Sequence, residues 1–296
     1  MSGLEEISVR LSGPVLLAAL VGFGFLVGIL TGLFGVGGGF LIVPMLRLLF
    51  GIDWPVAVGS SLAFTIGAGA SGTARHMRLR NVEPRSAAIL AAAAGVGAVL
   101  GAMLLESLKA RLGRGGPARF DVAMHGLFVV MLAVTAYLLY RRAEAERTRP
   151  ALLQRVPFRP RIALPHADLE DVSLPGLVLL GVGVGVLTGL MGIGGGVLYM
   201  PILILVVGLT PHQAVGTSLA VVLFGSVAGT IKHGLAGNVN LVLTMALLVG
   251  SSVGIQAGAW LCDRLHGSRL RRWFAALVAA TAVVLAADLA RKLAAS

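Results

Sequence analysis

Residues 31–44 read TGLFGVGGGFLIVP, and residues 188–201 read TGLMGIGGGVLYMP, so one apolar, glycine-rich signature occurs twice, 157 positions apart. When residues 28–82 are laid on residues 185–239 without a gap, 25 of the 55 positions are identical. The chain is therefore a duplicated unit. Each copy places three consecutive glycines inside a hydrophobic run, and this predicts a broken helix at that point.

The composition is that of an integral membrane protein. Of the 296 residues, 57% are hydrophobic and 12% are charged, whereas soluble domains average roughly 25% charged residues. Long stretches without internal charge recur along the chain, and most approach the roughly 20 residues that cross a bilayer. These stretches are 13–34, 55–74, 86–105, 122–140, 174–191, 214–231, 241–261 and 273–287.

The charge distribution argues for membrane orientation and against nucleic-acid binding. The chain has 24 Lys and Arg against 13 Asp and Glu, and the basic residues lie almost wholly in short loops between apolar stretches. Their largest cluster is in the connector between the copies, so we expect this connector to be cytoplasmic. Cys262 is the only cysteine, which excludes an internal disulfide and a thiolate metal cluster. We expect no cofactor and no metal.

The sequence predicts an all-α polytopic protein with two homologous transmembrane repeats. We place the first repeat at residues 1–140, the basic connector at 141–172 and the second repeat at 173–296. Each repeat is expected to hold four or five membrane segments: a long helix, the glycine break, a short segment and three further helices.

The short segments, residues 40–50 and 197–207, decide the topology. Eleven helical residues span about 16 Å, about half of the hydrocarbon core, so each segment is predicted to be a half-helix, a re-entrant arm or part of a bent hairpin. If each counts as a crossing, the second repeat is inverted, and if not, it is parallel. Basic-residue counts fit both, and we favour inversion because inverted repeats commonly build alternating access.

The triple glycines are the first candidate binding site. Such a break frees backbone N–H groups, and the helix that follows presents unpaired donors with a partial positive charge at its N-terminus. We therefore predict an anion site that comprises Gly37, Gly38, Gly39 and Phe40 in one copy and Gly194, Gly195, Gly196 and Val197 in the other. The alternative is that the glycines only allow close helix packing, as the four-residue spacing of Gly24, Gly28 and Gly32 suggests for those three.

Small hydroxyl side chains form the second candidate group. The pairs Ser60-Ser61 and Thr217-Ser218 match across the copies, and each is expected to open a helix. They either donate hydrogen bonds to an anion or cap the helix and bond to its backbone. Thr65 lies one turn after Ser61 and extends this polar face, although its counterpart is a valine.

Other polar residues in apolar surroundings give weaker signals. His76 and His233 match across the copies and are interpreted either as a proton relay or first contact for an anion, or as anchors that reach into the headgroups. Arg47, which interrupts the first short segment, either binds substrate or snorkels to the surface. Gln256 makes either an interhelical hydrogen bond or a substrate contact.

Acidic residues are informative by their positions. Asp53, Glu106, Asp121 and Asp263 fall near predicted helix ends, and Asp288 is placed to pair with Arg291 or Lys292. Because the buried carboxylate of many cation-coupled pumps is missing, the sequence favours an anionic substrate.

The doubled G-x-G-G-G motif, the proline five residues after it and the A-V-G-[ST]-S-L-A stretch make the chain resemble the sulfite exporter TauE/SafE family of membrane permeases. The resemblance spans nearly all of both copies and excludes the connector. It implies transport of small sulfur-containing anions or organic acids, such as sulfite, sulfoacetate and organosulfonates. It also implies a bacterial or archaeal cytoplasmic membrane.

Taken together, these patterns predict a secondary transporter of small anions that works by alternating access. The alternatives are a passive anion channel and a transporter of a non-sulfur organic acid. An enzyme is not expected, because the chain has no H-E-x-x-H, no C-x-x-C and no intramembrane pair of aspartates. The expected partners are the anion and the lipid bilayer, and the oligomeric state is left open, with a homodimer as one alternative.

Overall fold

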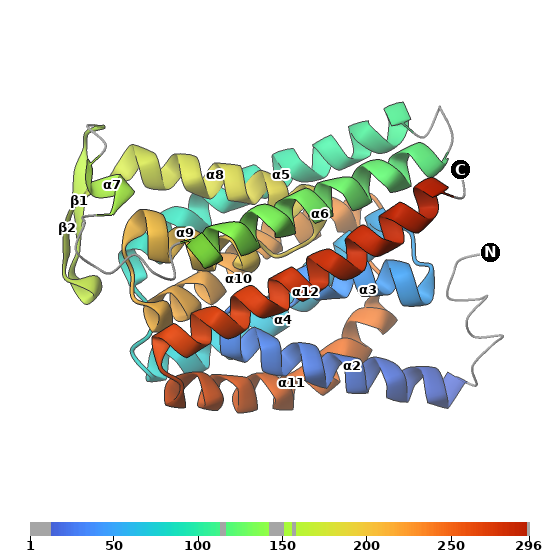
Figure 1. Ribbon diagram of the computed structural model, residues 1–296, viewed down its shortest axis with the longest axis horizontal. Helices are drawn as coiled ribbons and strands as arrows, with labels where there is room; N and C mark the ends of the chain where they lie inside the picture. The colour runs from blue at the N-terminus through green and yellow to red at the C-terminus, as the bar shows by residue number, and fades with distance from the viewer. Residues whose placement is uncertain (1–12, 113–116, 142–150, 156–157, 295–296) are drawn as a thin grey trace.

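The computed structural model describes residues 13–112, 117–141, 151–155 and 158–294. Within these residues, five helical elements precede the connector and five follow it (Figure 1). The first group is α2 (Gly13–Phe34), α3 (Gly39–Phe50), α4 (Trp54–Arg78), α5 (Pro84–Leu112) and α6 (Pro117–Arg141). The second group is α8 (Leu174–Met191), α9 (Gly196–Ile202) with its continuation η3 (Leu203–Val207), α10 (Pro211–Leu235), α11 (Leu241–Arg264) and α12 (Gly267–Ala294).

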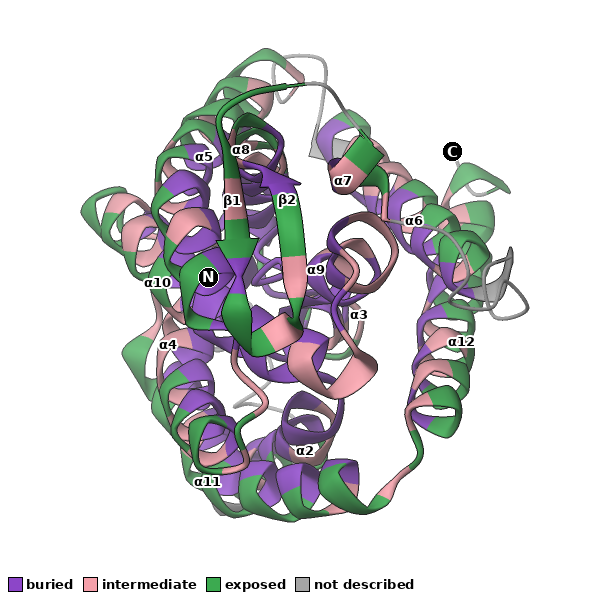
Figure 2. Cartoon of the chain, turned by 90° about the vertical axis from the view of Figure 1, so that its left-hand side faces the viewer, coloured by how far each residue is buried: buried purple, intermediate pink, exposed green. Residues whose placement is uncertain are grey.

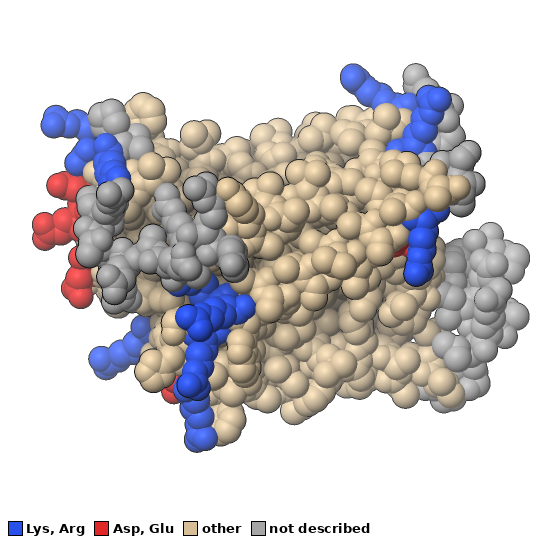
Figure 3. Space-filling model, in the orientation of Figure 1, with Lys and Arg blue, Asp and Glu red and all other residues tan. Residues whose placement is uncertain are grey.

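Within the described residues, seven helices are long and apolar enough to cross a membrane, with mean hydropathies of 1.7 to 2.4: α2, α5, α6, α8, α10, α11 and α12. Helix α4 is 25 residues long but falls outside this group, because its glycines and hydroxyl residues lower its hydropathy. On the face drawn in Figure 3, Lys, Arg, Asp and Glu gather at the two ends, and the band between them carries no charge. This confirms a multi-pass membrane protein.

The two groups of helices are interleaved. Helices α4 and α10 pack on each other, α2 packs on α11, α5 packs on α8, and α6 packs on α12. The first long helix of each copy thus contacts a helix of the other copy. Viewed from one end, α3 and α9 lie inside the ring formed by the longer helices (Figure 2).

The contact between α2 and α11 is made by small residues. Gly24, Gly28 and Gly32 face the backbone of α11, and a Cβ added to Gly28 would lie 2.6 Å from Ser251 O. Helix α11 has glycines at the same four-residue spacing, Gly250, Gly254 and Gly258, which face the backbone of α2. The two backbones therefore approach closely. The predicted packing role of the three α2 glycines is confirmed.

Both short segments form short apolar helices, which we call half-helices because each is shorter than the roughly 20 residues that cross a bilayer. Helix α3 has 12 residues, whereas α9 has 7 and continues as a five-residue π-helix, η3. In Figure 1, α2 runs from right to left and α8 from left to right, and α12 ends on the right, the side where α2 begins. Helix α3 leaves its glycine break toward the right, and α9 leaves toward the left, on the connector side.

The described part of the connector forms a small cap. It contains α7 (Leu152–Arg155), strand β1 (Arg161–Leu164), the 3-10 turn η2 (Pro165–Ala167) and strand β2 (Leu169–Ser173). The strands pair antiparallel, with Ile162 opposite Val172 and an irregularity before Leu164. Figure 2 shows this hairpin lying across the end of the helices. Residues 142–150 and 156–157 of the predicted basic connector lie outside the described residues.

Two side chains hold the hairpin against the helices. Arg85 Nη1 of α5 donates to Ala163 O at 3.1 Å, and Gln213 Nε2 of α10 donates to His166 O at 2.6 Å. The side chains of Leu164 and Val172 are fully buried beneath it. The hairpin is therefore packed onto the helices and not only tethered to them.

Candidate functional site

The two glycine breaks have the same backbone conformation. In the first glycine loop, residues 35–38, φ is +72° at Gly35, +69° at Gly37 and +81° at Gly38. In the second glycine loop, residues 192–195, the corresponding glycines have φ of +67°, +67° and +77°. Residues with a side chain rarely adopt these angles, so the repeated glycines are required by the turn itself.

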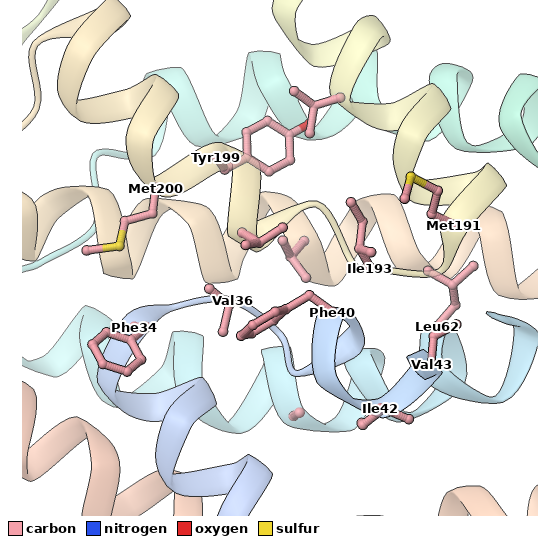
Figure 4. Packing of buried hydrophobic residues seen from close by; sticks show 14 of the residues in the cluster. Phe34, Val36, Phe40, Ile42, Val43, Leu62, Met191, Ile193, Tyr199 and Met200 are labelled. Carbon is pink, nitrogen blue, oxygen red and sulfur yellow. The ribbon is translucent and has the colours of Figure 1, made fainter. Parts of the chain in front are cut away.

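The two loops cross in direct contact. A Cβ on Gly39 would meet the backbone of Ile193, and a Cβ on Gly196 would meet the backbone of Val36. Figure 4 shows Val36 and Ile193 on the two loops, with Phe40 at the start of α3 beside them. Every residue of 35–40 and 192–197 is buried. In this conformation the crossing is closed to solvent.

A serine from each copy holds the loop of the other copy. Ser61 Oγ on α4 donates to Gly192 O at 2.9 Å, and Ser218 Oγ on α10 donates to Gly35 O at 2.8 Å. These equivalent bonds fix the carbonyl groups of both loops. The sequence identified both serines, but not their partners, which lie 131 and 183 residues away.

The hydroxyl pairs do not open their helices, and this part of the prediction is wrong. Helix α4 begins at Trp54, and α10 begins at Pro211 after the cap residue Thr210. Thr210 and Gln213 form a capping box, which fixes the start of α10 well before Thr217.

The first hydroxyl of each pair accepts a hydrogen bond from a helix start in the other copy. Ser60 Oγ accepts from Asn240 N at 2.9 Å, and Thr217 Oγ1 accepts from Glu83 N at 2.9 Å. Because these oxygens act as acceptors here, each hydroxyl still has its own hydrogen to donate.

One pair of residues at the crossing differs between the copies. Thr65 and its counterpart Val222 both contact Gly37 and Gly194. Thr65 Oγ1 lies 3.1 Å from Gly37 O and 2.7 Å from Ser61 O, whereas valine has no hydroxyl to offer. The crossing is therefore polar on one side and apolar on the other.

The half-helices begin with unpaired backbone donors. Gly38 is the cap of α3 and Gly195 is the cap of α9, and neither makes a side-chain cap bond. The first turn of a helix has no intrahelical partner for its N–H groups, and the described residues supply none for Gly39, Phe40, Gly196 or Val197. Two helix N-termini, each with a partial positive charge, therefore lie at the crossing.

Sequence reasoning missed one further hydroxyl at this place. Thr31 Oγ1 is buried and has no hydrogen-bond partner among the residues that the structure describes. It lies 3.1 Å from where a Cβ of Gly38 would be, beside the start of α3. Its counterpart Thr188 donates to Val184 O at 2.9 Å. The available signal was its place as the first residue of the repeated motif.

The two histidines are structural ties, and their interpretation as headgroup anchors is wrong. Both rings are fully buried. His76 Nε2 lies 3.0 Å from Gly32 O, and His233 Nε2 lies 2.9 Å from Gly189 O, so each ring donates from Nε2 to the last turn of the long helix before the break. A proton-relay role for them stays a prediction.

Arg47 neither reaches the surface freely nor faces the crossing. Its Nε and Nη2 atoms lie 2.9 and 2.8 Å from Asp121 Oδ1 on α6. Because the carboxylate is 74 residues away in the sequence, the pair could not be read from local spacing.

Gln256 makes the interhelical bond that was one of its two predicted roles, from Nε2 to Ser71 Oγ at 3.0 Å.

Comparison with known proteins gives a consistent assignment. The family model described as "Sulfite exporter TauE/SafE" matches residues 20–285. A "Probable membrane transporter protein" of Xylella fastidiosa is 31% identical, over 90% of this chain and 94% of its own length. "Probable membrane transporter protein YunE" of Bacillus subtilis is 28% identical, over 81% and 86%. A relative of the same description from Methanocaldococcus jannaschii is 27% identical, over 82% and 86%. No solved structure matches the chain.

Proposed function

The chain belongs to the sulfite exporter TauE/SafE family, and we propose that it is a secondary transporter that moves small anions by alternating access. We favour sulfur-containing oxyanions or organosulfonates, such as sulfite or sulfoacetate, as the cargo. A non-sulfur organic acid is the alternative. The protein would act in the bacterial or archaeal cytoplasmic membrane, as a carrier and not as an enzyme.

The observation that carries this proposal is the meeting of two half-helix N-termini at the crossed glycine loops. Free N–H groups and the helix dipole favour an anion at such a place. Half-helix N-termini that point at an anionic group near the bilayer midplane are a known construction in transporters. Thr31, whose hydroxyl has no hydrogen-bond partner among the described residues, lies beside the start of α3 and can add a donor there.

We further propose that the copies are inverted repeats of five segments each. Three observations support this: the opposite directions of α2 and α8, the opposite directions of the two half-helices, and equivalent bonds 157 positions apart, such as those of Ser61 and Ser218. With the connector cytoplasmic, both ends of the chain would then lie outside. Labelling of a C-terminal tag in intact cells tests this arrangement, and a protected tag would contradict it.

The substrate class can be tested by binding. We expect sulfite, thiosulfate or sulfoacetate to raise the melting temperature of the purified protein in a concentration-dependent way, because a ligand of the folded state stabilises it. Taurine, acetate and malonate serve as comparisons. Stabilisation by the carboxylates alone would favour the organic-acid alternative.

The site can be tested by removing one backbone donor. In Val197→Pro the N–H at the second position of α9 is lost, and proline is tolerated in the first turn of a helix. We expect affinity for the active anion to fall roughly tenfold or more, the cost of a charge-assisted hydrogen bond. The matched control Val197→Ala also loses the valine side chain but keeps the N–H. Equal affinity in both folded variants would contradict the proposed site.

Transport mode needs a separate measurement. In vesicles loaded with unlabelled anion, a carrier gives counterflow of labelled anion, whereas a channel gives only flux down the gradient. The buried crossing supports the carrier, because no residue of either loop is exposed. Flux without counterflow would favour the channel.

A further inference from the structure

A cluster of charged side chains lies at the end of the molecule opposite the connector. Asp121 of α6 is its centre: it contacts Arg47 of α3, accepts from Trp54 Nε1 at 2.7 Å, and accepts from Lys292 Nζ of α12 at 2.9 Å. Asp288 of α12 lies 3.1 Å from the same ammonium group. We call Arg47, Asp121, His125, Asp288 and Lys292 the charge cluster.

The cluster ties the end of one half-helix to two long helices. Its carboxylates are partly buried, with the side chain 14% exposed at Asp121 and 26% exposed at Asp288. Asp53 adds a third, largely exposed carboxylate 3.7 Å from Arg47. In the second copy Ile204 occupies the position of Arg47, so the duplicated fold does not itself require this cluster.

His125 lies among these charges, and its neighbours favour two different protonation states of the ring. Its ring is fully buried and stands edge-on to Trp54, with 4.9 Å between ring centroids. Nδ1 lies 2.9 Å from Asp121 O, which can only accept, so Nδ1 carries a hydrogen. The ring is then neutral if Nε2 has no hydrogen and positively charged if Nε2 carries one.

Nε2 of His125 has one donor and one acceptor as neighbours. Lys292 Nζ lies 3.1 Å away and can only donate, which requires a neutral ring. Asp288 Oδ2 lies 3.2 Å away and, ionised, can only accept, which requires a hydrogen on Nε2. That Asp288 oxygen is buried and receives no hydrogen bond of regular geometry from the described residues. A proton on Nε2 supplies the missing donor.

We propose that the charge cluster is a proton-binding site, in which a proton from the face opposite the connector binds Nε2 of His125 and loosens the hold on α3. This inference rests on the proposed transport function and names the proton as the ion that controls it. No covalent bond other than N–H changes: the Nε2 lone pair takes the proton, Nε2 then donates to Asp288, and Lys292 moves off the ring.

The effect on α3 follows from the charges. With a neutral ring, Arg47 and Lys292 face Asp121 and Asp288, and the largely exposed Asp53 lies on the outer side of Arg47. The protonated ring adds one positive charge, with Nδ1 3.6 Å from Asp121 Oδ2, and it competes with Arg47 for that carboxylate. Low pH therefore weakens the bond that fixes the end of α3, and α3 carries the first glycine loop.

The test measures the distance between α3 and α12 in the full-length protein without any substrate. Spin labels go on cysteines at Leu49 and Ala290, which are exposed, whereas native Cys262 is buried. Between about pH 8 and about pH 5 we expect the population with the longer distance to rise at least about threefold.

Two variants identify the group responsible. His125→Gln, which does not titrate, should abolish this pH response, and His266→Gln, an exposed histidine at the other end of α12, should keep it. In Asp121→Asn the longer distance should dominate at both pH values. An unchanged response in His125→Gln, or no response in the wild type, would overturn the proposal.

The same protein separates this inference from the proposed function. If the distance responds to pH through His125 but no anion shows counterflow, the proton site stands and the transport proposal fails. If anions show counterflow while the distance is fixed at both pH values, the proton site alone is wrong.

Discussion

Helix α3 ends at Phe50 beside the charge cluster, whereas the other half-helix ends in the π-helix η3 beneath the connector. At their starts the two are alike, with left-handed glycine caps, buried loops and matching serine bonds. At their ends they differ: Arg47 pairs with Asp121, but its counterpart Ile204 is apolar, and α7 packs on η3 in its place. Duplication kept the crossing and let the two ends diverge.

The difference separates two kinds of contact. Ion pairs at the end of α3 are partly solvated and can be exchanged with water or a proton at small cost. After the end of η3, a Cβ added to Gly208 would lie near the apolar side chains of Ala151 and Leu169, and the apolar side chains of η3 form no ion pair in the described part of the chain. We therefore expect the two faces to respond differently to pH and salt.

The largest effects on stability should come from substitutions at the starts of α3 and α9, which are alike in the two copies. Because an added Cβ would meet backbone atoms of the opposite loop, Gly39→Ala and Gly196→Ala should each lower the free energy of unfolding by about 3 kcal/mol or more. Thermal unfolding in detergent measures this. The control Gly183→Ala has nothing within 4 Å of the new Cβ and should change little. A large difference between the first two variants would break the equivalence of the starts.

The next effect should appear only at the end of α3. Arg47→Met leaves the partly buried Asp121 without its guanidinium partner and should cost about 1 to 3 kcal/mol, since Lys292 and Trp54 still contact that carboxylate. Ile204→Met conserves an apolar contact and should cost less than about 1 kcal/mol. Chemical denaturation of the two variants side by side gives the comparison. Equal costs would mean that the ends are not held differently.

A smaller difference is expected where α4 and α10 begin. Thr210 accepts a hydrogen bond from Gln213 N, whereas Asp53 makes no side-chain cap bond. Thr210→Ala should therefore cost about 1 kcal/mol, and Asp53→Ala close to nothing. Melting temperatures measured at two salt concentrations would also detect any contribution from the exposed Asp53–Arg47 pair. A larger loss in Asp53→Ala would show that this pair matters more than its exposure suggests.

The smallest effect should come from the asymmetric pair at the crossing. Thr65→Val removes a hydroxyl near Gly37 O and should cost about 1 kcal/mol or less. The reciprocal Val222→Thr should cost nothing, because Gly194 O is the equivalent acceptor on the other side. Thermal unfolding of the two variants, measured side by side, distinguishes their effects on stability. If Thr65→Val left the free energy of unfolding unchanged while Val222→Thr lowered it, the expected asymmetry would be reversed.

Local patterns predicted a break at each triple glycine and a short segment after it, but they left a half-helix, a re-entrant arm and a bent hairpin open as the form of that segment. The sequence also holds signals for the starts of α4 and α10, namely Trp54-Pro55 and the T-x-x-Q box at Thr210, but the prediction placed these starts at the hydroxyl pairs instead.

What could not be read was pairing over long distances. Ser61 and Ser218 were singled out, but each bonds to the opposite copy, and no local spacing specifies such a partner. The charge cluster joins residues of α3, α6 and α12. The local pair of Asp288 and Lys292 was predicted and is present, and Arg47 was singled out, but the contacts of Lys292 and Arg47 with Asp121 on α6 join distant parts of the chain. The connector hairpin was not predicted because its sequence is short, charged and unlike either repeat.

The interleaving of the two copies bears on how the chain is made. Helix α2 reaches the membrane early, but its glycine face has no partner until α11 has been synthesised, more than 200 residues later. At about 5 to 20 residues per second, that delay is roughly 10 to 50 s. During it the first half must be sheltered by lipid or by the insertion machinery. Two separately expressed halves should need each other to accumulate, since the largest helix–helix contacts join one half to the other.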